Sequence, residues 1–307
     1  MLALALLLDA LIGDPDALWR RVPHPVVLMG RLVALLEEGL NHGRWRRAKG
    51  VLAVSILCLS VAAPALFLSI SLFGGVLEVA IAAILLAQRS LVRHVEAVAD
   101  ALSKSLDKGR EAVGHIVGRE TAEMQREDVA RSAIESAAEN FSDGVVAPAF
   151  WFLLLGLPGI AVYKAVNTAD SMIGHRTPRY EAFGWAAARL DDAMNWIPAR
   201  LAGVLIAVVG TGREAFDCMM RDAVLHRSPN AGWPEAAMAA SLGIKLGGPR
   251  AYAGTVRDDP WLNAGGERVP GVGEIRAAVT QIWKAWQIVV GAAAVLWLVA
   301  LLFGLVF

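Results

Sequence analysis

The stretch GVVAPAFWFLLLGLPGIAVYKAV, residues 144–166, is apolar over a length that suffices to cross a membrane, yet it contains helix-breaking residues. A spanning helix needs about 20 mostly apolar residues. Pro148 and the pair Pro158 and Gly159 interrupt the helical continuity of this stretch. The segment either crosses fully or re-enters, and broken helices at membrane depth are tolerated where they line a cavity. We expect the break to fold the segment back, which would bring Glu139 and Asp170 together.

The composition of the whole chain is that of a membrane protein. Hydrophobic residues make up 56% of it and charged residues 19%, with a mean hydropathy of +0.50. Soluble domains average roughly 45–50% apolar and about 25% charged residues. The 29 basic and 29 acidic residues cancel, so no net field attracts nucleic acid, and we expect no nucleic-acid partner. Cys58 and Cys218 have no metal-binding spacing and are expected to be small buried residues.

We predict an all-α, multi-pass integral membrane protein with about four to six membrane helices, one of them broken or re-entrant, and with polar helical loops. Residues 1–307 are interpreted as a single membrane-embedded domain. Its candidate membrane segments are residues 1–12, 51–73, 76–88, 144–166, 197–212 and 287–307. The polar regions between them are residues 13–50, 90–143, 167–196 and 213–286.

One acidic helix face precedes the apolar stretch. Arg131, Glu135, Glu139 and Asp143 recur every four residues, so on a helix they drift only about 40° per step. Such a face can hold a hard cation such as Mg²⁺, whose protein ligands are carboxylates. The alternative is a solvated face with an Arg131–Glu135 ion pair worth under about 1 kcal/mol. The neighbouring apolar segment and Asn140 favour the metal.

Two further blocks place cations, amides and acids together. In YKAVNTADSMIGH, residues 163–175, Lys164, Asn167 and Asp170 share one helix face, which suits phosphate or carboxylate binding with metal support. Capping by Asn167 and a boundary position for Lys164 are the alternative. In ARLDDAMNWIPAR, residues 188–200, Asp191 and Asp192 either ligate a metal or complement a helix dipole, and the spacing leaves both open.

Other polar residues lie outside this cluster, among them Asp14, His24 and Asn230. The chain contains no Walker A sequence, Rossmann GxGxxG, GxSxG elbow or HExxH motif, so the common nucleotide, hydrolase and zinc-protease motifs are absent. The residues therefore indicate a polyanionic or carboxylate substrate, handled with a hard metal at a membrane face.

Six blocks in this order resemble the CobD/CbiB family of cobalamin biosynthesis from about Leu2 to the C-terminal segment. They are DALIGDP, HPVVLMGR, ESAAENFSDGVVAP, YKAVNTADSMIGH, ARLDDAMNWIPAR and SPNAGWPEAAMA. The resemblance implies a multi-pass membrane protein with adenosylcobinamide-phosphate synthase activity. This enzyme is an ATP-dependent carbon–nitrogen ligase that joins adenosylcobyric acid to aminopropanol or aminopropanol phosphate. ATP and Mg²⁺ are the implied cofactors, and the corrinoid is a substrate.

The site that we predict on this basis has three sets of residues. The catalytic residues are Glu139, Asp170 and Lys164, with Glu139 as general base. The substrate- and phosphate-binding residues are Arg131, Asn140, Asn167, Asp14, His24 and Asn230. The candidate metal ligands are Glu135, Glu139, Asp143, Asp170, Asp191 and Asp192. Membrane lipid is the expected surrounding, and a homo-oligomer is left open.

The basic residues of the early polar region favour a cytoplasmic side for it and for the active face of an inner-membrane protein. Two other classes of function compete with the ligase. A transporter would use broken helices and half-buried charges as a midplane site, although the sequence lacks two matching halves. A sensor or regulatory membrane protein would tolerate replacement of the acidic residues.

Overall fold

The computed structural model describes residues 1–118, 120–252 and 255–304, without the side chains of residues 16 and 250–257. The chain divides into two compact units. Unit 1 comprises Met1–Ala87, Ala147–Asn195 and Ala292–Phe307, and unit 2 comprises Gln88–Val146 and Trp196–Gly291. The prediction of one membrane-embedded domain stays a prediction.

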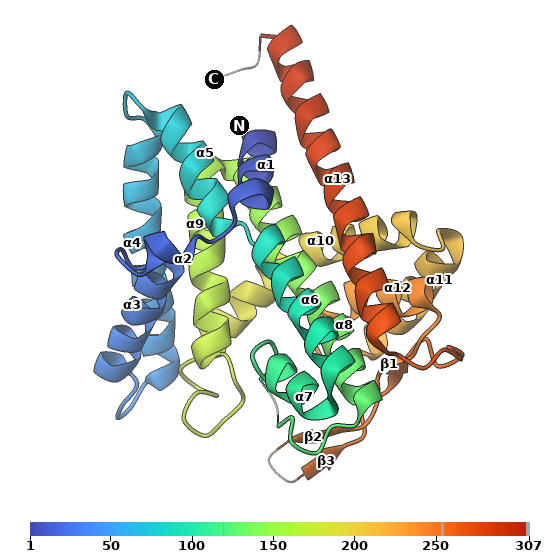
Figure 1. Cartoon of the computed structure of the whole chain (residues 1–307). Coiled ribbons are helices and arrows are strands. Elements are labelled where there is room, and N and C mark those ends of the chain that lie inside the picture. The colour runs from blue at the N-terminus through green and yellow to red at the C-terminus, as the bar shows by residue number, and fades with distance from the viewer. Residues whose placement is uncertain (119, 253–254, 305–307) are drawn as a thin grey trace. The chain divides into compact units, whose positions relative to one another are not determined.

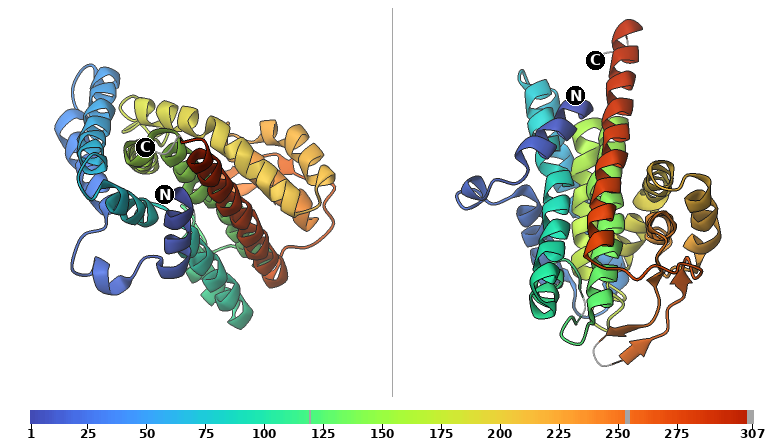
Figure 2. Two further views of the ribbon diagram at one scale, coloured as in Figure 1. Left: turned by 90° about the horizontal axis from the view of Figure 1, so that it is seen from above. Right: turned by 45° about the vertical axis from the view of Figure 1, so that its right-hand side comes forward.

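Unit 1 consists of helices joined by loops in its described residues, and α9 packs against α3, α4 and α5 (Figure 1 and Figure 2). Its complete helices are α1 (Leu2–Ile12), α2 (Asp16–Trp19), α3 (Pro25–Leu40), α4 (Arg46–Ser69), α5 (Gly74–Leu85) and α9 (Ala147–Ile173). Helix α10 (Trp185–Val209) begins in unit 1 and continues into unit 2, while α13 (Val272–Leu302) runs the other way.

Unit 2 is mostly helical and carries four short strands. Its helices are α6 (Gln88–Lys104), α7 (Leu106–Gly114), α8 (Arg126–Phe141), the π-helix η1 (Ser142–Val146), α11 (Arg213–Asp222), the 3₁₀ turn η2 (Ala223–Leu225) and α12 (Gly232–Leu242). The strands are β1 (Leu246–Gly247), β2 (Arg250–Tyr252), β3 (Thr255–Arg257) and β4 (Trp261–Leu262). β1 pairs with β4 and β2 with β3, both antiparallel. Helix α12 packs against α8 and α11.

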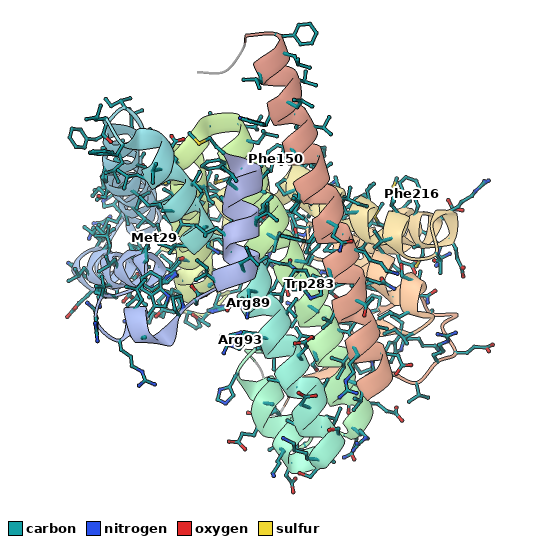
Figure 3. All side chains as sticks on the ribbon, turned by 45° about the horizontal axis from the view of Figure 1, so that its top comes forward. Met29, Arg89, Arg93, Phe150, Phe216 and Trp283 are labelled. Atoms are coloured by element: carbon teal, nitrogen blue, oxygen red, sulfur yellow. The ribbon has the colours of Figure 1, made fainter. Side chains whose placement is uncertain are left out.

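Within the described residues, five helical stretches are long and apolar enough to cross a membrane, which confirms the all-α multi-pass prediction. They are Arg46–Ser69, Gly74–Lys104, Arg126–Ile173, Trp185–Val209 and Val272–Leu302. The last has only 17% of its most apolar window buried against protein, so its apolar side chains are available to lipid. Figure 3 shows side chains standing out around its final turns.

The early polar region is more ordered than expected. Residues 25–40, which we placed in a polar loop, form α3, with His24 as its N-cap and Pro25 at its first position. Proline is favoured there because its missing N–H would have no intrahelical partner. Helix α4 also starts earlier, at Arg46, so three basic residues of the expected loop lie on its first turn.

The apolar stretch is broken at Gly156, whose φ of 61° and ψ of −151° interrupt α9. A Cβ at Gly159 would overlap the Trp151 carbonyl oxygen, although these residues would be about 12 Å apart along a straight helix. The two arms therefore touch. The predicted break is confirmed, and it lies two residues before Pro158 because only glycine adopts this backbone conformation readily. The re-entrance of this segment into a membrane stays a prediction.

The polar region before α8 is helical, as its apolar spacing indicates. Leu91, Val95 and Leu102 are buried on one face of α6. Arg89 and Arg93 are exposed on another, as Figure 3 shows. Helix α6 packs this apolar face against α7 and α8 within unit 2.

Candidate functional site

A buried polar network joins the second arm of α9 to the start of α10 inside unit 1. The Asp191 carboxylate accepts hydrogen bonds from Asn167 Nδ2 at 3.2 Å and from Asn195 Nδ2 at 3.0 Å. The Tyr163 hydroxyl donates to Asn195 Oδ1 at 2.9 Å. Tyr163 is fully buried, and Asp191 exposes 9% of its surface. Burial of a carboxylate costs free energy unless hydrogen bonds replace those that it makes to water, and the Asn167 and Asn195 side-chain amides supply such bonds.

The network follows from sequence spacing on each helix. Tyr163 and Asn167 are four residues apart on α9, and Asp191 and Asn195 are four apart on α10, so each pair shares a helix face. The first arm of α9 contacts the same place, because Trp151 Nε1 donates to the Met194 carbonyl at 3.1 Å. Both arms of the broken helix α9 are therefore hydrogen-bonded to one turn of α10.

Asp170 lies beside this network. It follows Asn167 by three residues on α9, and its charge lies near enough to Asp191 to repel it. Its carboxylate folds over the helix end, where a Cβ at Gly174 would overlap Asp170 Oδ1. Two of the predicted blocks thus bring Asn167, Asp170 and Asp191 together.

The remaining predicted residues of these blocks lie nearby in the chain. Lys164 is half-buried on α9, and its carbonyl accepts a hydrogen bond from Thr168 Oγ1 at 2.6 Å. Asp192 points away from the position of Asp191 on α10 and pairs with Arg189 at 3.1 Å. Adjacent residues diverge by about 100° on a helix, which is why Asp191 and Asp192 differ in surroundings.

A charged clasp, which the sequence reasoning missed, fixes the loop between α9 and α10. Arg179 donates to both oxygens of Glu37, from Nε at 3.0 Å and from Nη2 at 2.9 Å. Asn41 donates to Glu37 Oε1 at 2.7 Å, and Arg46 donates to the Arg179 carbonyl. The hydrogen bonds from Arg179 hold the pKa of Glu37 below its ordinary value, against the opposing effect of burial. The available signal was the position of Glu37, which follows Met29 and Val33 at four-residue spacing on the buried face of α3.

Asp14 and His24, two of the predicted substrate-binding residues, lie in contact with each other. His24 Nε2 lies 3.4 Å from Asp14 Oδ1, and the ring packs edge-on against Trp19. His24 Nδ1 accepts the Val26 amide at 3.1 Å as the cap of α3. An accepting Nδ1 leaves the proton of a neutral ring on Nε2, where it faces the carboxylate.

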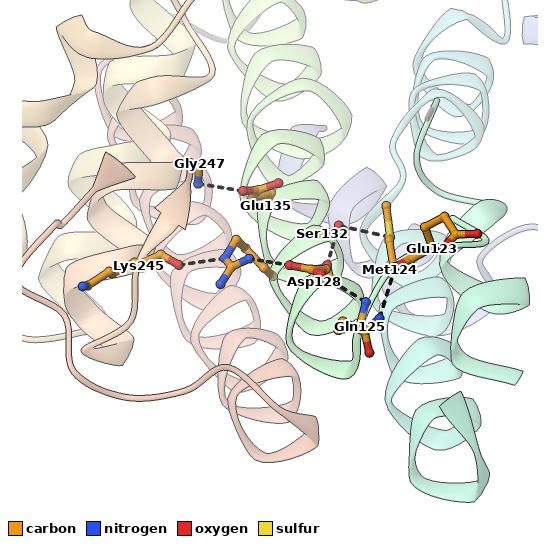
Figure 4. Close-up of polar contacts among 9 residues, drawn as sticks. Glu123, Met124, Gln125, Asp128, Ser132, Glu135, Lys245 and Gly247 are labelled. Atoms are coloured by element: carbon orange, nitrogen blue, oxygen red, sulfur yellow. Dashed lines mark hydrogen bonds and ion pairs between the residues drawn. The ribbon is translucent and has the colours of Figure 1, made fainter. Parts of the chain in front are cut away.

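Arg131, on α8 in unit 2, contacts three different groups, and Figure 4 shows two of them, Asp128 and Lys245. Its Nη1 pairs with Asp128 at 2.8 Å, and its Nε donates to the Lys245 carbonyl at 3.3 Å. Its guanidinium also lies 4.9 Å from the centre of the Trp261 ring. The nearest acid to which Arg131 is paired is thus Asp128, three residues before it on α8, whereas the alternative considered above was a pair with Glu135.

Glu135 instead accepts the Gly247 amide at 2.8 Å and exposes only 5% of its surface. Gly247 has a φ of 76°, and a Cβ there would come within 2.6 Å of the Pro260 carbonyl. The contact therefore anchors a tight backbone turn to α8. The predicted role of Glu135 as a metal ligand stays a prediction.

The other acids of this face are separated by a change of helix type. Glu139 and Asn140 are exposed near the end of α8, and Asn140 donates to the Ser136 carbonyl at 2.9 Å. Asp143 lies within the π-helix Ser142–Val146 and is half-buried. A π-helix adds a residue to the turn, so Asp143 does not continue the four-residue face, and such turns occur frequently at functional sites.

Asn230 is buried just before α12, in a turn built on Ser228 and His226. The backbone N–H of Asn230 donates to Ser228 Oγ at 3.2 Å. His226 Nδ1 accepts the Ser228 amide at 3.1 Å, and its Nε2 lies 3.7 Å from the buried Glu235 carboxylate. Sequence reasoning singled out Asn230 but gave no role to His226, because one histidine in a polar region carries little information by itself.

No group of three or more His, Cys, Asp or Glu side chains converges as a metal cage within the described residues. A Mg²⁺ site needs fewer protein ligands than such a cage, because one or two carboxylates usually hold the ion together with substrate phosphates and water. The charges of Asp170 and Asp191 lie near enough to repel each other, and their role as Mg²⁺ ligands stays a prediction. Glu139 and Asp143 belong to unit 2, so their part in a shared site with Asp170 stays a prediction.

The model of the family described as CobD/Cbib protein matches residues 2–282. The chain belongs to the CobD/CbiB family. Relatives named cobalamin biosynthesis protein CobD are 48% identical in Sinorhizobium fredii, 47% in Rhizobium meliloti and 48% in Rhodobacter capsulatus. These matches cover 96%, 99% and 98% of this chain and 96%, 98% and 98% of the relatives. No solved structure matches this member of the CobD/CbiB family.

Proposed function

We propose that this CobD/CbiB family member is an adenosylcobinamide-phosphate synthase. It joins a propionate carboxylate of adenosylcobyric acid to the amine of aminopropanol or aminopropanol phosphate, at the expense of ATP. The observation that carries the proposal is that two blocks of the family resemblance, residues 163–175 and 188–200, form the buried network around Asp191. Polar groups inside an apolar helix pair are costly, and they mark functional sites in membrane proteins.

The proposed chemistry has two steps. First, a carboxylate oxygen of the corrinoid attacks the γ-phosphorus of ATP, so that an acyl phosphate forms and ADP leaves. The donor nitrogen then attacks the acyl carbon, phosphate leaves, and the nitrogen gives up a proton to complete the amide. Because a free carboxylate is a poor acyl donor in water, the protein must hold the two substrates close together and neutralise the phosphate charge.

The α9 and α10 network supplies oxygen and amide groups for the first step. Asn167 offers an amide at the edge of the network, and Asp170 and Asp191 would hold Mg²⁺, which neutralises charge on the transferring phosphoryl group when it is bound. Lys164 is the cation of the same helix arm and is assigned to phosphate contact. Tyr163 and Asn195 act as positioning residues, because Asn195 donates to the Asp191 carboxylate and Tyr163 donates to Asn195.

Glu139 is assigned as the base that takes the proton of the amine. Its carboxylate is exposed on the last turn of α8, where a substrate can reach it. Arg131 and Asn140 are assigned to binding of the substrate phosphate on the same helix. All three residues belong to unit 2, and the role of Glu139 is tested by the variant Glu139→Gln.

The decisive assay uses the purified full-length protein with adenosylcobyric acid, ATP, Mg²⁺ and each amine donor in turn. Mass spectrometry should find the amide product only in the complete mixture, and excess chelator should abolish it. Absence of product with both donors would overturn the proposal. The α9 break also suits a transporter, so sealed vesicles are tested in parallel, and uptake of the corrinoid without covalent product would favour that function.

The active face is proposed to lie on the cytoplasmic side of the inner membrane. Ser171→Cys and Ser228→Cys should then both react with a membrane-impermeant maleimide from the cytoplasmic side of inverted vesicles. Native Cys218 can stay in place, because burial and the nearby Asp222 charge raise its pKa to about 12, which keeps the thiol protonated and unreactive. Labelling of the two positions from opposite sides would contradict a shared face.

A further inference from the structure

A patch of positive charge surrounds the first turn of α4 in unit 1. Residues 37–49 and 174–184 carry six arginines and lysines against three acids, and one of these acids, Glu37, is already paired with Arg179. Arg46 joins the two segments, because its guanidinium donates to the Arg179 carbonyl. We use the name basic patch for the surface formed by Arg44, Arg46, Arg47, Lys49 and Arg179.

Three cations of the basic patch are held by neutral groups. Arg46 donates to a carbonyl oxygen, as described above, and Lys49 Nζ donates to the His42 carbonyl at 2.8 Å. The Arg47 guanidinium lies over the Trp185 ring, 3.8 Å from its centre. Contacts of this kind fix the side chains but leave their net charge in place, so the patch still attracts an anion.

The basic patch lies at the end of a helix that is long enough to cross a membrane. The 24 residues of α4 are about 36 Å long, whereas the bilayer core is about 30 Å thick. Because charged side chains are costly in the core, the first turn of α4 belongs in the layer of lipid headgroups. Further along α4, Leu52, Leu59 and Leu66 are exposed at seven-residue spacing, which places them on one face. A lipid chain can therefore lie along α4 while its headgroup meets the basic patch.

An exposed tryptophan stands in the middle of these cations. Trp45, the N-cap residue of α4, exposes 76% of its surface and has a φ of 65°, which is uncommon for a bulky side chain. Tryptophan is enriched at membrane–water interfaces, because its ring is apolar and its indole N–H is polar. Trp45 thus gives the basic patch an apolar side chain at the level of the headgroups.

We propose that the basic patch binds the headgroup of an anionic phospholipid, with Arg44 and Arg47 on its phosphate. A planar guanidinium matches phosphate well, and basic clusters beside a membrane helix attract anionic lipids. Arg44 and Arg47 are exposed, whereas Arg46 and Arg179 take part in the charged clasp. Stacking on Trp185 occupies the flat face of the Arg47 guanidinium and leaves the N–H donors at its edge for phosphate oxygens. This lipid site does not depend on the proposed ligase activity.

The test is native mass spectrometry of the purified full-length protein in detergent, which resolves each bound lipid. Dioleoyl-phosphatidylglycerol, dioleoyl-phosphatidylcholine and inorganic phosphate are titrated separately. The intact protein should bind phosphatidylglycerol at least about tenfold more tightly than phosphatidylcholine, because only the former carries a net negative charge and each nearby cation contributes about a fivefold gain. Equal binding of the two lipids, or equally tight binding of inorganic phosphate, would overturn the proposal.

A pair of double variants then locates the headgroup. Arg44→Ala with Arg47→Ala should weaken phosphatidylglycerol at least about tenfold and leave phosphatidylcholine unchanged. The matched control is Arg20→Ala with Arg21→Ala, which removes two exposed cations of the same unit that lie outside the basic patch. Equal weakening by the two double variants would mean that the lipid responds to the overall charge of the protein, which would overturn the site.

A single variant and a salt titration keep the test decisive if the double variant misfolds. Thermal melting without lipid identifies that case, which is relevant because Arg47 also packs on Trp185. Arg44→Ala, at an exposed position before α4, should still weaken phosphatidylglycerol by about fivefold. The affinity of the intact protein should also fall as ammonium acetate is raised, since salt screens exposed charges. An affinity that is unchanged in Arg44→Ala, or independent of salt, would overturn the proposal.

Discussion

Polar residues of α9 and α10 converge on one carboxylate, whereas Arg131 and Glu135 of α8 contact different neighbours. Asp191 gathers two amides and, through Asn195, the Tyr163 hydroxyl. On α8, Glu135 contacts a β-turn, and Glu139 lies exposed. Both regions look alike in sequence, as acids at helical spacing beside an apolar stretch. Spacing tells which residues share a face, but the element packed on that face decides what they do.

The largest expected effects concern activity. Asp170→Asn and Glu139→Gln should each lower amide formation by about 10²–10⁴-fold, because one removes a metal ligand and the other a base. Product is measured by mass spectrometry at equal amounts of folded protein, with the exposed acid variant Asp217→Asn as control. If only Asp170→Asn is impaired, the chemistry is confined to the converging region. Near-normal turnover in both variants would remove both assignments.

Stability should separate the two regions next. Asp191→Ala removes the acceptor of two side-chain amides, the buried Asn195 and the half-buried Asn167, whereas Glu135→Ala removes the acceptor of the Gly247 backbone amide. An orphaned buried donor costs about 1–3 kcal/mol, so the Asp191 variant should melt at the lower temperature. Thermal unfolding in one detergent compares the variants. A larger loss for Glu135→Ala would mean that the turn at Gly247 matters more than the network.

Acid should loosen the clasp that fixes the α9–α10 loop. The pKa of Glu37 is lowered from 4.5 by its Arg179 hydrogen bonds, so the stabilisation is complete above about pH 4.5 and is lost as the pH falls through the folded-state pKa. Limited proteolysis should therefore cut residues 174–184 faster at low pH. Glu37→Gln should be cut quickly at every pH, and an unchanged pH profile in this variant would show that another group is responsible.

The smallest effect is expected for single hydrogen bonds. Tyr163→Phe removes one donor from the network and should cost about 0.6 kcal/mol, at most about 1.7, as for other polar contacts between membrane helices. Asn140→Ala, at an exposed position of α8, should stay within about 0.5 kcal/mol of the wild type. Equal losses of unfolding free energy in the two variants would contradict the view that polar contacts stabilise the α9–α10 network more than they stabilise α8.

The sequence predicts the helical membrane architecture and the break in α9, because apolar length, proline and glycine report on backbone continuity directly. It also names Asn167, Asp170 and Asp191, which the fold brings together. It does not predict α3, where the apolar face is short and interrupted. The Glu37–Arg179 clasp joins residues far apart in the chain, and no local pattern marks such a pair. The π-helix likewise depends on tertiary packing and leaves no periodic signal.

The break at Gly156 also bears on how the chain enters the membrane during synthesis. As one straight rod, the 27 residues of α9 would be about 40 Å long and would deliver everything after them to the far side. The arm before Gly156 is continuous with η1 and α8, so the helical run from Arg126 to Leu155 would be about 45 Å long, enough to cross a bilayer core of about 30 Å. The bend at Gly156 turns the second arm back, so residues 126–173 form a helical hairpin and not a single crossing. The direction in which the chain continues towards α10 thus depends on the backbone conformation of one glycine.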